Sequence, residues 1–108
     1  MTRAEISSGV CGFTTIAEAH MNGSNCTLSI TSDCEAIQRL AAELTHVDPF
    51  QEISFQGEAP LILQLAAKHC PHAACPVPVG IIKAVEVETG LALPADVTIQ
   101  LSNPEDNR

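Results

Sequence analysis

The sequence has few cations. It contains five Lys and Arg residues against thirteen Asp and Glu residues, which gives a formal net charge of −8 at pH 7. The five cations are scattered along the chain, at Arg3, Arg39, Lys68, Lys83 and Arg108. Phosphate groups are bound by clustered cations, so this composition disfavours nucleic acid and anionic membrane surfaces as partners.

Long apolar runs are also missing. No stretch reaches the roughly eighteen apolar residues that a membrane-spanning helix needs. The first residues, MTRAEISSG, lack the apolar segment of a signal peptide. The sequence therefore predicts a cytoplasmic protein with no membrane association. Five cysteines in a reducing compartment are not expected to form a disulfide framework, and they are better interpreted as ligands, reactive thiols or core residues.

The common enzyme signatures are absent. There is no GxSxG motif, no P-loop and no GxGxxG motif. The acidic residues are spread along faces where solvation explains them. No reaction is predicted, and whether the protein is an enzyme stays open.

The length of 108 residues fits one domain, which can bury about two-thirds of the surface of its unfolded chain. Such a domain should fold without a metal ion, unlike a zinc finger. We expect a single domain over residues 1–108, with a polar tail from about residue 102.

Alternating apolar and polar residues predict strands in the first third of the chain. Residues 4–10 form a weak strand candidate. Residues 13–21 and 26–31 alternate on either side of Asn22-Gly23, a strong hairpin turn signal. Two further short strands are expected near residues 53–57 and at Val97, Ile99 and Leu101.

Three helices are predicted. The first follows a capping box in which Ser32 or Asp33 is the cap. Its apolar positions are Ile37, Leu40, Ala41 and Leu44. The second runs from Pro60 to a stop at Pro71 and is apolar nearly all round, so we expect it to be largely buried. The third runs from Pro78 to Gly90. The expected fold is an α+β domain with three helices packed on a largely antiparallel sheet.

One segment, HCPHAACPVP at 69–78, concentrates groups that can bind a metal ion. Thiolate and imidazole ligands suit zinc and iron. His72 and Cys75 are three residues apart in a loop whose prolines restrict its motion, so both could bind one ion at low entropic cost. The alternative is an apolar loop, because free cysteines are often simply buried.

Two more cysteines lie at the ends of predicted elements. Cys34 falls in the first turn of the first helix, where unpaired N–H groups and the helix dipole favour a thiolate. Cys11 falls in a turn between Gly9 and Gly12. A Cys₃His set of Cys11, Cys34, His72 and Cys75 would suit zinc or an iron–sulfur cluster. Cys26 is expected in the core, and Cys70 is either core or a spare thiol.

GVCGFTT at 9–15, SDC at 32–34 and HAACPVPVGIIKAVEVETGLALPADVTI at 72–99 together resemble a family of short hypothetical proteins. Members of that family are about this length and come largely from anaerobic archaea and bacteria. Its pattern falls on Cys11, Cys34, His72 and Cys75. The family has no assigned function, so the resemblance supplies no substrate or reaction. An anaerobic setting would favour an iron–sulfur cluster.

Three functions remain open. The first is binding of a metal ion or iron–sulfur cluster without turnover. The second is a thiol-based redox or sulfur-carrier protein in which Cys34 or Cys75 is the nucleophile and His72 is its base. The third is a domain that binds a protein partner and whose cysteines are mostly core.

Overall fold

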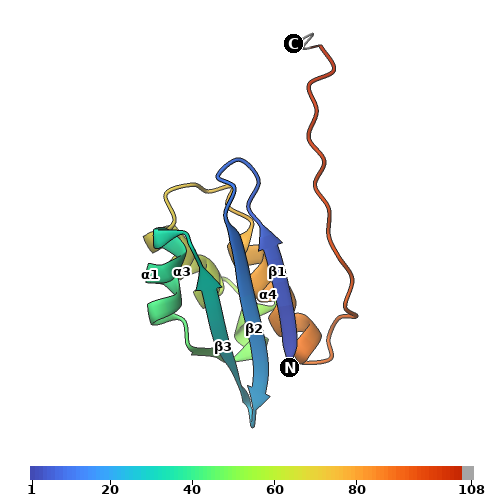
Figure 1. The fold of residues 1–108 in the computed structure, drawn as a ribbon. Coiled ribbons are helices and arrows are strands. Elements are labelled where there is room, and N and C mark those ends of the chain that lie inside the picture. The colour runs from blue at the N-terminus through green and yellow to red at the C-terminus, as the bar shows by residue number, and fades with distance from the viewer. Residues whose placement is uncertain (106–108) are drawn as a thin grey trace.

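A computed structural model describes residues 1–105 as an antiparallel sheet with helices on one face (Figure 1). The strands are β1 (Thr2–Ser7), β2 (Thr14–Asn22), β3 (Asn25–Ser32) and β4 (His46–Val47). The helices are α1 (Glu35–Glu43), α2 (Pro49–Glu52), α3 (Leu61–His69) and α4 (Val77–Glu88). The α+β prediction is confirmed, with one short helix more than expected.

The sheet has the strand order β1-β2-β3-β4, and each neighbouring pair is antiparallel. The predicted turn at Asn22-Gly23 joins β2 to β3, and Gly23 has a φ of 66°. Along β2, Thr15, Ala17 and Ala19 are buried toward the helices, while His20 is exposed. An antiparallel sheet with one packed face and one solvated face accounts for this alternation.

The core lies between the sheet and the helices. Helix α4 packs on β1 and β2, and α1 packs on β3. Ile37, Leu40 and Leu44 are buried together, as predicted, and Cys26 is also in the core. Gly80 lets α4 approach β1 closely, because a Cβ atom at this position would clash with the side chain of Ile6.

Helix α3 is less buried than its apolar sequence predicted. Ile62 is its one fully buried residue, and Leu61 is exposed. The helix packs against α1 and α4 at the side of the molecule, so part of its circumference faces solvent. At its end, Lys68 and His69 donate to the carboxylate of Glu43 at the end of α1.

The region after α1 departs from prediction. Asp48-Pro49 starts α2, a short helix that the sequence analysis did not predict: the Asp48 side chain accepts a hydrogen bond from Phe50 N, and Pro49 takes the first helical position. No strand forms at 53–57, and residues 46–47 pair with β3 instead.

The predicted last strand is also wrong. Val97, Ile99 and Leu101 lie in an extended segment with no partner strand, and Figure 1 shows this segment leaving the body of the molecule. An alternating pattern forms a strand only where a neighbouring strand supplies hydrogen bonds, and none lies beside it. Within residues 1–105, no helix has the length and apolar character needed to cross a membrane.

Candidate metal and thiol site

The sheet register places Cys11 and Cys34 at the same end of the sheet. Thr15, near the start of β2, pairs with Ser32, at the end of β3, and their hydroxyl groups are hydrogen-bonded at 2.9 Å. Cys11 lies in the loop that leads into β2, and Cys34 follows β3 by two residues. We call this end of the sheet, where Thr15 pairs with Ser32, the thiol end.

The direction of α4 brings Cys75 to the thiol end as well. Gly80, in the first turn of α4, contacts Ile6 near the end of β1. At the other end of the helix, Glu88 accepts a hydrogen bond from the Thr2 hydroxyl at the start of β1. Helix α4 therefore begins at the thiol end, and Cys75 lies just before it (Figure 1).

Cys34 has a different place in α1 from the one predicted. It is the N-cap residue itself, and its side chain makes no capping hydrogen bond. Neither Ser32 nor Asp33 caps the helix. Ser32 Oγ instead accepts a hydrogen bond at 3.1 Å from the backbone N–H of Cys34, the residue before the first helical position. The half-buried thiol of Cys34 is left available for other contacts.

Cys70 joins this group, although the sequence suggested only a core residue or a spare thiol. Burial raises the pKa of the Cys70 thiol, and the neighbouring thiols of Cys75 and Cys34 raise it further. Cys34, Cys70 and Cys75 are all half-buried and pack against the core. The sequence signal was that Cys70 and Cys75 share one proline-bounded loop.

The loop that contains Cys70 and Cys75 also lines a pocket of about 370 Å³. Cys70, His72 and Cys75 contribute its polar atoms, and the other walls are mostly aliphatic side chains of α3 and of the start of α4. His72 itself is exposed. The pocket therefore gives a small molecule or ion access to two thiols and an imidazole.

Three of the four predicted ligands, Cys11, Cys34 and Cys75, lie at the thiol end, and His72 lies in the loop that leads to Cys75. Cys11 is exposed in a turn formed by Gly9 and Gly12, whose φ angles are 81° and 75°. Within residues 1–105, no group of three or more His, Cys, Asp or Glu side chains is arranged to hold a metal ion. All five cysteines are free thiols. The Cys₃His set thus stays a prediction.

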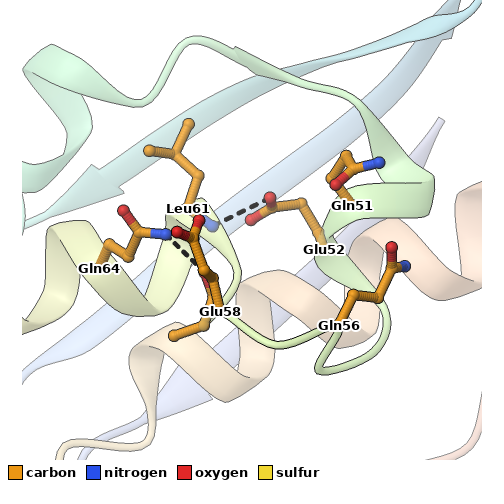
Figure 2. Close-up of a pocket in the computed structure, with 7 residues that line it drawn as sticks. Gln51, Glu52, Gln56, Glu58, Leu61 and Gln64 are labelled. Atoms are coloured by element: carbon orange, nitrogen blue, oxygen red, sulfur yellow. Dashed lines mark hydrogen bonds between the residues drawn. The ribbon is translucent and has the colours of Figure 1, made fainter.

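A second pocket, of about 250 Å³, lies between α2 and α3 and is polar (Figure 2). Its centre is the buried carboxylate of Glu52, which accepts hydrogen bonds from Leu61 N at 3.0 Å and Ile62 N at 2.7 Å. These are free N–H groups at the start of α3, so Glu52 acts as the cap of that helix. Gln64 donates to the carbonyl of Ala59 beside it. The polar groups of this pocket are explained by the capping of α3, and no pattern in the sequence indicated this role for Glu52.

The fold and the thiol end define a small α+β protein with a cysteine-rich site at one end of its sheet. The chain belongs to a family of unknown function, DUF6951, whose sequence profile matches residues 2–101. Comparisons with curated proteins and with solved structures find no match.

Proposed function

We propose that this protein binds a zinc ion or an iron–sulfur cluster at the thiol end and has no turnover of its own. The ligands are Cys11, Cys34, His72 and Cys75. The observation that carries the proposal is a shared location: the loop before β2, the start of α1 and the loop before α4 are far apart in sequence and lie at the same end of the sheet. A group of thiols and an imidazole has the ligand chemistry of a soft metal site.

The scaffold supports such a site without depending on it. Cys34 and Cys75 are held by α1 and α4, whose apolar faces are packed in the core. Cys11 and His72 are exposed on loops, where small movements can bring them toward the two fixed thiols. Two ligands at helix starts and two on exposed loops would together supply the site.

Metal content tests this proposal. Protein purified without oxygen is assayed for zinc, iron and acid-labile sulfide, and we expect about one ion or cluster per chain. The Cys34→Ser variant should lose this ion or cluster. Cys26→Ala is the matched control, because Cys26 lies at the other end of the sheet, paired with Met21 and Val47. Substoichiometric metal in the wild-type protein, or equal loss in both variants, contradicts the proposal.

A second set of variants identifies the ligands. Cys11→Ser and His72→Ala should each lower metal occupancy, while Cys70→Ala should leave it unchanged. If Cys70→Ala loses the metal and both Cys11→Ser and His72→Ala keep it, the site is assigned to Cys34, Cys70 and Cys75. Absorption near 400 nm distinguishes an iron–sulfur cluster from zinc, because zinc has no charge-transfer band there.

Cys70 and Cys75 line the same pocket, and this favours a second candidate, thiol–disulfide exchange. The Cys75 thiolate would attack a disulfide of a partner and release one thiol. Cys70 would then attack the Cys75 sulfur, release the second thiol and leave a Cys70–Cys75 disulfide. A Cys70→Ser variant should accumulate the mixed disulfide, which mass spectrometry detects. If the oxidised wild-type protein contains no Cys70–Cys75 disulfide, this candidate is wrong.

A further inference from the structure

The segment after α4 is extended and exposes its apolar side chains. Helix α4 ends before Gly90, which has a φ of 78°. Beyond it, Leu93, Val97, Ile99 and Leu101 are 87%, 62%, 76% and 92% exposed. No backbone hydrogen bond joins residues 92–105 to any other described part of the chain. Figure 1 shows the segment extending well beyond the sheet.

This segment has the pattern of a strand that lacks its partner. Val97, Ile99 and Leu101 lie on one face, and Thr98 and Gln100 lie on the other. Exposed, regularly spaced apolar residues of this kind mark an interaction surface. The family profile extends to residue 101, so the segment belongs to the family's domain.

An unpaired strand edge of matching length is present in the same molecule. Strand β1 lies at the edge of the sheet and pairs on one side only, with β2. It has six residues, as does the segment 96–101, and neither contains proline. In β1, Ile6 faces the helices and is buried, whereas Arg3 and Glu5 are exposed. An open edge of this type accepts an added strand through its free N–H and C=O groups.

We propose that residues 96–101 add as a fifth strand to the β1 edge of a second copy of this chain, and that two copies exchange these strands reciprocally. Each copy carries one donor segment and one acceptor edge, so a two-fold dimer pairs both. The chain after α4 begins close to the start of its own β1, because Glu88 at the end of α4 accepts a hydrogen bond from Thr2. It nevertheless leaves that edge unpaired and projects away from the body of the molecule. Val97, Ile99 and Leu101 would then cover the side of the partner's helical layer.

Light scattering after size exclusion tests the dimer on the full chain. We expect a mass of two chains for the wild-type protein. Ile99→Asp should weaken dimerisation by about tenfold or more, because a charge replaces a buried apolar group. Gln100→Asp is the matched control on the opposite face and should remain dimeric. Ile99 lies outside the core, so Ile99→Asp should keep the helical circular dichroism signal and the cooperative unfolding of the wild-type protein.

Amide hydrogen exchange separates the dimer from other pairings. In the dimer, the amides of residues 97–101 that face the partner strand and the β1 amides that do not pair with β2 should be protected, and Ile99→Asp should expose them. A monomer in which these amides are unprotected overturns the proposal. A monomer in which they are protected also overturns it, and assigns the segment to the β1 edge of its own chain. Neither outcome affects the metal proposal, which is tested by metal content.

Discussion

The two ends of the sheet differ in how their polar groups are paired. At the far end, where β1 begins and β2 turns into β3, the carboxylate of Glu88 accepts hydrogen bonds from Met21 N at 3.0 Å and from the Thr2 hydroxyl at 2.9 Å. The N-terminal ammonium group lies 3.4 Å from the same carboxylate. These hydrogen bonds, that of the Met21 N–H first, hold the pKa of Glu88 below its usual value.

Among the described residues, no carboxylate accepts hydrogen bonds in this way at the thiol end, where the hydroxyl of Ser32 is hydrogen-bonded to Thr15 and to Cys34 N. Cys34, Cys70 and Cys75 are half-buried there, and burial raises the pKa of the Cys70 thiol, as do the neighbouring thiols of Cys75 and Cys34. The far end therefore joins the end of α4 to the sheet through a charged group, while the thiol end carries half-buried thiols on the same scaffold.

The largest expected effect comes from the core that both ends share. Leu40→Ala removes a fully buried side chain between α1 and β3 and should lower the free energy of unfolding by about 2–5 kcal/mol. Urea denaturation measures this loss. A loss below about 1 kcal/mol would mean that the helix face is not packed as described, and the ends could not be compared on one rigid scaffold.

Removing the charge of Glu88 at the far end should have the next largest effect. Glu88→Gln removes the charge that accepts two hydrogen bonds and should cost about 1–3 kcal/mol at pH 7. Glu43→Gln is the control, since Glu43 is exposed and also accepts from two side chains. Equal losses of stability in the two variants would contradict a special role for the far end.

The pH dependence of the same variant follows from the direction of the pKa shift. A carboxylate whose pKa is lower in the folded state adds stability above its unfolded pKa of about 4.3 and loses it as the pH falls through the folded value. The wild-type protein should therefore lose its advantage over Glu88→Gln on acidification below about pH 4.3. Denaturation midpoints at pH 7 and in this acidic range check the prediction. A constant difference between the two proteins would contradict it.

Local patterns were sufficient to predict much of the fold. The hairpin at Asn22-Gly23, the buried face of α1 and the core position of Cys26 all depend on neighbouring residues. The same local patterns did not identify hydrogen-bonding partners that lie outside each element. The capping of α3 by Glu52 joins residues nine and ten positions apart, and the strand pattern at 97–101 has no partner in its own chain.

The same distinction applies to the candidate site. The sequence placed Cys34 and Cys75 at element ends, but their shared location depends on strand order and on the direction of α4. The proximity of Cys70 to both thiols depends on the path of the loop after α3, which prolines restrict but do not determine.

The smallest expected effect is on the stability of thiol variants without metal. Cys34→Ser and Cys75→Ser should each change the free energy of unfolding by less than about 1 kcal/mol in reduced, chelator-treated protein, because both positions are partly exposed. Cys26→Ser is the same chemical change at a fully buried position and should cost about 1–3 kcal/mol, since its hydroxyl is buried among apolar groups. Urea denaturation of the three variants checks this order. If Cys34→Ser or Cys75→Ser destabilises the protein as much as Cys26→Ser, the thiols at this end are part of the core and the contrast between the two ends fails.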